Sequence, residues 1–158
     1  MVVSRARMSQ EYSTSVKIQI INPPSKVFEG IVNPKHMTNY WICESSGRMI
    51  EDTTVKWRFP EFKDSFNAEV KRIEEDKYVS FTWFADNHED LVEICLESVG
   101  DKNTKVTITE RRLDNGAMSL QWVKGSTEGW TNFLACLKAY LEYGINLRKG
   151  AFDFLRKQ

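Results

Sequence analysis

The chain has 158 residues, with 22 basic and 22 acidic side chains, so its formal net charge at neutral pH is zero. This length fits one domain with a substantial buried core. The balanced charge provides no electrostatic attraction to nucleic acid or to an anionic membrane, and we expect neither as a partner. The apolar runs are far shorter than the roughly 20 residues of a membrane-spanning helix, so we expect no membrane span.

The N-terminal sequence MVVSRARMSQEYSTS contains two arginines but lacks the apolar block of a secretory signal. Cys43, Cys95 and Cys136 are odd in number and have no CxxC spacing, which predicts free thiols. Both observations favour a cytoplasmic location. We expect residues 1–14 to be a flexible segment and residues 15–158 to form a single domain.

The first predicted element is a strand at residues 15–21, where apolar and polar side chains alternate. Asn22-Pro23-Pro24 ends this strand, and two short helices are predicted at residues 25–31 and 35–41, each starting after a proline. Six more strands follow, separated by turn-like polar clusters, at residues 47–50, 53–59, 65–73, 78–84, 90–98 and 104–113. Antiparallel hairpins are the economical connection between such strands.

Residues 119–143 form the only long run with helical periodicity, and a further short helix is predicted within residues 148–158. Side chains spaced by three and four residues give the long helix one apolar and aromatic face, made of Trp122, Ser126, Gly129, Trp130, Phe133, Leu137 and Leu141. Gly125 and Gly129 lie one turn apart, and each weakens a helix by roughly 1 kcal/mol. We therefore expect something large, or another backbone, to come close at these two glycines.

The strands also have one consistently apolar face. Its members, taken from parity, are Val55, Trp57, Phe59, Phe66, Ala68, Val70, Val79, Phe81, Trp83, Val92, Ile94, Leu96, Val106 and Ile108. The long helix is the element available to cover this face. The sequence therefore predicts an α+β fold in which a curved, seven-stranded antiparallel sheet wraps around a long C-terminal helix.

The space between sheet and helix has two possible contents, a packed core or an apolar cavity for a small ligand, and the sequence leaves both open. A cavity lined by aromatic rings would select flat or long apolar molecules. The candidate ligand-contacting residues are Trp41, Trp57, Phe66, Phe81, Trp83, Ile94, Ile108, Glu110, Arg112, Trp130, Phe133 and Leu137.

Glu110 and Arg112 are unusual because they share the parity of apolar residues on their strand. Either the strand end turns out into solvent, or the two charges pair with each other or contact the polar head of a ligand. His36 and His88 have no cysteine or carboxylate at a metal-ligand spacing, so we predict no metal site and no cofactor. We assign no catalytic residue.

The order of elements resembles the activator of heat-shock protein 90 ATPase homologue-like family, within the helix-grip superfamily of START and birch-pollen-allergen-like domains. The similar residues are PSKVF from Pro24, Trp41, Trp83, VTIT from Val106, and TEGWTNFLACLKAYLE from Thr127. The resemblance covers most of the chain. It implies the helix-grip fold with an internal apolar cavity, in a family whose members include lipid carriers, hormone or polyketide binders, some cyclases and chaperone activators.

Three hypotheses for function follow. The first is a module that binds a small apolar ligand, such as a lipid or an aromatic molecule. The second is a chaperone-related module that binds a protein partner or forms a homodimer, favoured by Phe152, Phe154 and Leu155 in the basic tail. The third is a cyclase or hydrolase that uses Glu110 or His36 as general acid or base.

Overall fold

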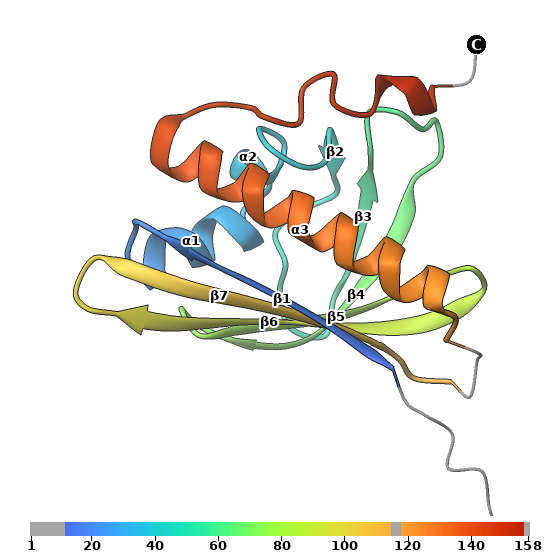
Figure 1. Ribbon diagram of the computed structural model, residues 1–158, viewed down its shortest axis with the longest axis horizontal. Helices are drawn as coiled ribbons and strands as arrows, with labels where there is room; N and C mark the ends of the chain where they lie inside the picture. The colour runs from blue at the N-terminus through green and yellow to red at the C-terminus, as the bar shows by residue number, and fades with distance from the viewer. Residues whose placement is uncertain (1–11, 115–117, 157–158) are drawn as a thin grey trace, which may run out of the picture.

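The computed structural model describes residues 12–114 and 118–156, and its main feature is a seven-stranded antiparallel sheet crossed by one long helix (Figure 1). The strand order is β1-β7-β6-β5-β4-β3-β2, so each strand after β2 lies beside the strand that precedes it. The strands are β1 Ser13–Ile20, β2 Glu44–Ser45, β3 Thr54–Arg58, β4 Phe66–Glu74, β5 Tyr78–Ala85, β6 His88–Val99 and β7 Asn103–Arg112. The helix-grip fold predicted from the sequence is confirmed.

The long helix α3, Leu120–Tyr143, lies over one face of the sheet. It begins where the Ser119 side chain accepts a 3.1 Å hydrogen bond from the backbone N–H of Trp122, and it ends at Gly144, whose φ of 67° gives the left-handed C-cap. Residues 145–156, which we call the strap, then run back across the helical side of the molecule toward β3 (Figure 1). The extra helix predicted in this tail is one 3₁₀ turn, Asp153–Leu155.

Two short helices, α1 (Pro24–Val32) and α2 (Pro34–Met37), follow β1 as predicted. Pro34 ends α1 and also removes the N–H that would bond the Gly30 carbonyl four residues earlier. The buried Tyr40 hydroxyl replaces this donor and bonds the Gly30 oxygen at 2.7 Å. The second helix is shorter than the predicted 35–41, because the chain turns after Met37 and places Tyr40 in the core.

The second strand is not at residues 47–50, and this prediction was wrong. The strand is the two-residue β2, which pairs with Trp57 and Arg58 of β3. Met49 is instead buried as part of an irregular segment, and its backbone N–H bonds the Val32 carbonyl at 3.1 Å. Of the predicted flexible segment 1–14, residues 1–11 lie outside the described part of the chain, and Ser13 and Thr14 already belong to β1.

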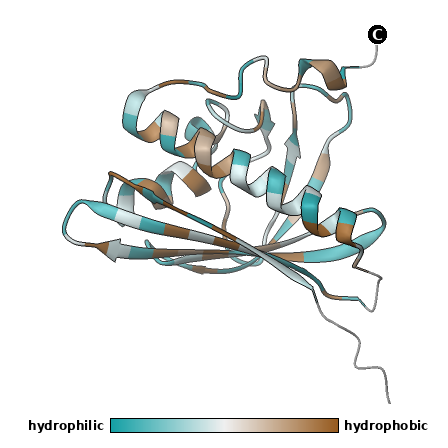
Figure 2. Cartoon of the chain, viewed as in Figure 1, coloured by the Kyte–Doolittle hydropathy of each residue, from teal (hydrophilic) through white to brown (hydrophobic). Residues whose placement is uncertain are grey.

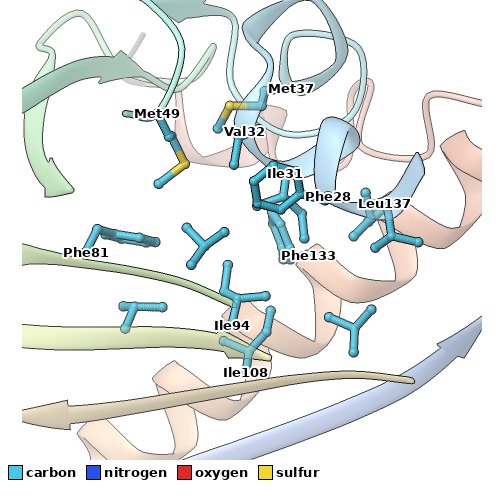
Figure 3. Packing of buried hydrophobic residues seen from close by; sticks show 14 of the residues in the cluster. Phe28, Ile31, Val32, Met37, Met49, Phe81, Ile94, Ile108, Phe133 and Leu137 are labelled. Atoms are coloured by element: carbon cyan, nitrogen blue, oxygen red, sulfur yellow. The ribbon is translucent and has the colours of Figure 1, made fainter. Parts of the chain in front are cut away.

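The hydrophobic core lies between the sheet, α1 and α3. Figure 2 shows hydrophobic and hydrophilic residues alternating along the strands, and Figure 3 shows the inward side chains meeting those of the helices. The sheet contributes Phe81, Ile94 and Ile108, and α3 contributes Phe133 and Leu137, all at most 3% exposed. The single apolar face predicted from strand parity is therefore the face that the helices cover.

Candidate functional site

Trp41, which follows α2, lies at the centre of a cluster of aromatic rings between the sheet and α3. Its ring centroid is 4.8 Å from that of Phe133, 5.1 Å from Trp57 and 5.8 Å from Trp130. Most of these pairs have the edge-to-face or tilted geometry that favours aromatic association. Residues from three separate parts of the chain thus meet at one place, and Trp41, only half-buried, reaches its surface.

Beside this cluster lies a cavity of about 360 Å³ that we call the aromatic groove. One wall consists of Trp41 and the loop after β3, with Phe59 and Phe62. The opposite wall is the flank of α3 that carries Gly125, Gly129, Asn132, Phe133 and Cys136, and the strap closes the groove with Arg148, Phe152 and Leu155. The volume is within the range of sites for small organic ligands.

The glycines of α3 keep this wall bare. Apart from its chain neighbours and the backbone of the same helix, a Cβ built at Gly125 or at Gly129 would have no protein atom within 4 Å. Both residues face open space, so the expectation that another backbone comes close to them was wrong, and nothing large from the protein itself approaches them. Cys136, lower on the same wall, has a pKa raised by burial, so its thiol stays protonated and acts as a small apolar surface.

A second hollow of about 500 Å³, which we call the polar hollow, lies nearer the N-terminus of α3. Gly125 lines both spaces, so they adjoin along the same flank of the helix. The polar hollow is bordered by Trp83, Glu110, Gln121, Trp122 and Ser126, together with Asp86. The polar hollow thus combines the Glu110 and Asp86 carboxylates with two indoles, whereas the aromatic groove has five aromatic side chains together with Glu128, Asn132 and Arg148.

Glu110 is only 4% exposed, and its carboxylate accepts three hydrogen bonds. Trp83 Nε1 donates to Oε2 at 2.7 Å, while Ser126 Oγ and Trp130 Nε1 donate to Oε1 at 2.5 and 3.3 Å. The alternative in which this strand end turns into solvent was wrong for Glu110. The carboxylate instead fixes two indole edges and the helix against the sheet.

Arg112 does not pair with Glu110, although the two share a strand face. Its guanidinium lies 3.6 Å from both Asp90 and Asp86 and 5.4 Å from the centre of the Trp122 ring. Asp90 is fully buried and accepts a hydrogen bond from Trp122 Nε1 at 3.2 Å. The pKa of Asp90 is raised to about 6, chiefly by burial and then by the charge of Glu110.

The two histidines lie in different places and hold no common site. His36 Nδ1 is 2.7 Å from the Tyr140 hydroxyl, and His88, at the start of β6, is 2.9 Å from the Asp114 carboxylate. Among residues 12–114 and 118–156, no cluster of three or more metal-ligating side chains is present. In the same part of the chain, no helix is long and apolar enough to cross a membrane.

The twelve residues predicted to contact a ligand fall into three groups. Trp41 and Phe133 line the aromatic groove, and Trp83 and Glu110 line the polar hollow. The others pack behind these walls, and they are Trp57, Phe66, Phe81, Ile94, Ile108, Arg112, Trp130 and Leu137.

The aromatic groove is also lined by Phe59, Phe62, Arg148 and Phe152, which are not among the predicted ligand contacts. Strand parity predicts that Phe59 faces inward, and the tail is rich in aromatic residues. No local pattern, however, places residue 148 next to residue 59.

Comparison with known proteins gives the family. The model of the family described as activator of Hsp90 ATPase homolog 1-like protein matches residues 22–142, which is most of the chain. The chain belongs to this family. The family resemblance predicted from the sequence is therefore confirmed, and it places the chain among ligand-binding or chaperone-related modules. No curated protein is a significant match.

This chain is also similar to proteins of known structure. The protein SSP2350 from Staphylococcus saprophyticus is 31% identical, with a TM-score of 0.75 over 87% of this chain and 96% of that one. The Aha1 dimer from Colwellia psychrerythraea is 22% identical, with a TM-score of 0.70 over 84% and 98%. DynU16, from the dynemicin biosynthetic locus, is 21% identical, with a TM-score of 0.75 over 85% of this chain and 48% of that one. The last two share the fold.

Proposed function

We propose that this chain binds a small, elongated, largely apolar molecule along the flank of α3. The aromatic groove takes the apolar or aromatic body, between Trp41 and Phe59 on one side and the glycine face of the helix on the other. The observation that carries the proposal is the pair Gly125 and Gly129, which weaken the helix and face a space that no protein atom fills.

The polar hollow sets the orientation of this ligand, because it would bind the polar end. It adjoins the groove at Gly125, and it is bordered by the carboxylates of Glu110 and Asp86. Glu110 Oε2 accepts one hydrogen bond, from Trp83, so one of its lone pairs is available to a donor on the ligand. We therefore infer a ligand with an apolar body and a hydrogen-bond donor, such as a hydroxyl or an amine, at one end.

Binding of the neutral fluorophore N-phenyl-1-naphthylamine tests the proposal. Gly129→Leu places a side chain in the groove and should weaken the binding at least about tenfold, because a ligand and the new side chain would compete for one space. Thr131→Leu adds a comparable side chain at an exposed position of α3 outside the groove, and it should leave binding unchanged.

Displacement of the fluorophore by a long-chain alcohol and by the matched alkane then tests the polar end. The alcohol should compete more strongly, and substitution of Glu110 should reduce its advantage. The proposal fails if the wild-type chain shows no saturable binding, or if Gly129→Leu and Thr131→Leu reduce binding equally.

A second candidate function is binding to a protein partner or to a second copy of the chain. The end of α3 and the strap expose several large apolar side chains, namely Tyr143, Ile145, Leu147, Phe154 and Leu155. Exposed apolar patches of this kind are typical of interaction surfaces. The Aha1 protein from Colwellia psychrerythraea, which has the same fold, forms a dimer. Sedimentation equilibrium of the purified chain tests self-association, and a monomer at every concentration would exclude the homodimer.

We place either function in the cytoplasm, where the three free cysteines would remain thiols.

A further inference from the structure

The strap is attached to the rest of the molecule at few points. Most of its residues are exposed, and only Arg148 and Phe152 are half-buried. Hollows lie on both sides of it: the aromatic groove, and a smaller space of about 210 Å³ beside Cys43, Pro60 and Lys149. Arg148 borders both of these spaces.

The contacts of Arg148 form a complete guanidinium site. Its Nη1 and Nη2 atoms donate to Glu61 Oε1 and Oε2 at 2.9 and 3.0 Å, the bidentate geometry typical of an arginine–carboxylate pair. The guanidinium carbon lies 4.9 Å from the ring centres of both Phe59 and Phe152, so it makes a cation–π contact with each of these two rings. The side chains of Glu61 and Arg148 are 2% and 12% exposed.

Phe59 and Glu61 lie in the loop after β3, in the body of the protein, and contacts independent of the strap hold the Phe59 ring and close this loop. The Phe59 ring lies 5.3 Å from Phe66 and 5.6 Å from Trp41. The loop between β3 and β4 is closed by Arg58, whose Nη1 donates to the Phe62 carbonyl at 3.0 Å. This half of the site is therefore preformed, and the strap adds Arg148 and Phe152.

The backbone of the strap makes its own hydrogen bonds. In the described part of the chain, the backbone bonds of residues 149–156 all run to carbonyls within the strap, for example from Ala151 to Arg148 and from Leu155 to Phe152. The strap starts after Gly144, whose left-handed backbone favours glycine. A change of torsion at this residue would break the 3.3 Å bond from the Ile145 N–H to the Ala139 carbonyl of α3, and would move residues 149–156 with their own backbone bonds intact.

We propose that Phe59 and Glu61 form a guanidinium-binding site, that its resident ligand is the chain's own Arg148, and that a competing guanidinium compound releases the strap. Release removes the wall that separates the two hollows and widens the aromatic groove. The site, and the opening of the strap, do not depend on which molecule the groove binds.

Chymotrypsin cleavage after Phe152, followed by mass spectrometry on the full chain, tests this inference. A protease needs an extended segment, so the strap must leave the body before it is cut. Glu61→Gln keeps the size of the side chain and removes its charge, and should speed cleavage about tenfold or more. Glu44→Gln removes the neighbouring carboxylate that pairs with Arg58 and should leave the rate within about twofold of wild type.

The wild-type chain supplies a second arm that needs no variant. Methylguanidinium should accelerate cleavage several-fold at a concentration where methylammonium, at equal ionic strength, has little effect, because only the planar cation can replace the fork of Arg148. In Glu61→Gln this acceleration should vanish. Cleavage of an unstructured peptide in each buffer corrects for effects on the protease.

Equal cleavage rates in wild type and folded Glu61→Gln would overturn the inference, as would equal acceleration by the two cations. Because the assay contains no apolar ligand, these outcomes leave the proposed function untouched. A loss of fluorophore binding, in turn, would say nothing about the strap.

Discussion

Trp83 and Glu110 lie on β5 and β7, two strands separated by β6, yet Trp83 Nε1 donates a 2.7 Å hydrogen bond to Glu110 Oε2. The same carboxylate also accepts the indole N–H of Trp130 from α3. One buried acceptor therefore holds an indole of the sheet and an indole of the helix. These two rings stack with their centroids 5.5 Å apart, beside the proposed ligand site.

Glu110→Gln should destabilise the fold by about 2–3 kcal/mol. Glutamine keeps one acceptor oxygen, but its amide group would face a donor, so at least one indole or hydroxyl loses a charge-assisted partner. Urea unfolding followed by tryptophan fluorescence measures the loss. Glu97→Gln, which removes an exposed carboxylate paired with Lys105, is the control and should change stability little. An unchanged stability in Glu110→Gln would contradict the anchoring role.

Gly129→Ala should stabilise the protein by about 0.5–1 kcal/mol, because alanine favours the helix and its methyl group meets no protein atom within 4 Å apart from its chain neighbours and the backbone of the same helix. Gly30→Ala is the matched control in α1, where the new Cβ would lie 3.2 Å from Leu141 Cδ2. The gain there should be smaller or absent. Thermal unfolding of both variants checks the difference, and equal shifts would mean that Gly129 does not face an open groove.

Tyr40→Phe should cost about 1–2 kcal/mol, because the Gly30 carbonyl loses the donor that replaces the missing N–H of Pro34. The ring itself, stacked on Tyr140 at 5.5 Å, is retained. Tyr143→Phe removes a hydroxyl from an exposed residue of α3 and should be neutral. Denaturant unfolding of the two variants compares them directly. A neutral Tyr40→Phe would show that the carbonyl finds another partner.

The stability of the fold should depend on pH through the titration of Asp90. Its folded pKa of about 6 lies above the value of roughly 3.9 for an unfolded aspartate, so between these values the folded chain binds more protons. Stability from the protonated carboxyl is therefore complete below about pH 4 and is lost as the pH rises through about 6.

Asp90→Asn removes the titrating group. Between about pH 4 and 6, the free energy of unfolding of this variant should therefore change with pH less than that of wild type, by the order of 1 kcal/mol. Asp86→Asn is the matched control, since Asp86 contacts the same Arg112 but has an 85% exposed side chain. Urea unfolding across this range measures both. A slope that persists in Asp90→Asn would assign the titration to another group.

Strand parity predicted the buried face of the sheet, because side chains alternate with period two whatever the strand pairs with. It failed at residues 47–50, where the burial of Met49 within an irregular segment decides the conformation. It also placed Glu110 inward correctly but could not supply its partners, which come from β5 and from α3.

By itself, the sequence determined the hydrophobic periodicity that predicts the strands and α3, and it determined the family. It also determined that α1 ends before Pro34 and that α3 ends at Gly144. These depend on residues close together in the chain, where propensity and spacing act directly. The tertiary structure decided which predicted side chains border open space, that Gly125 and Gly129 face a groove, and that Arg148 reaches Glu61 across 87 residues. Such contacts join segments that are far apart in the sequence. They form only after the sheet and α3 have packed, because this packing sets the position of each contacting residue.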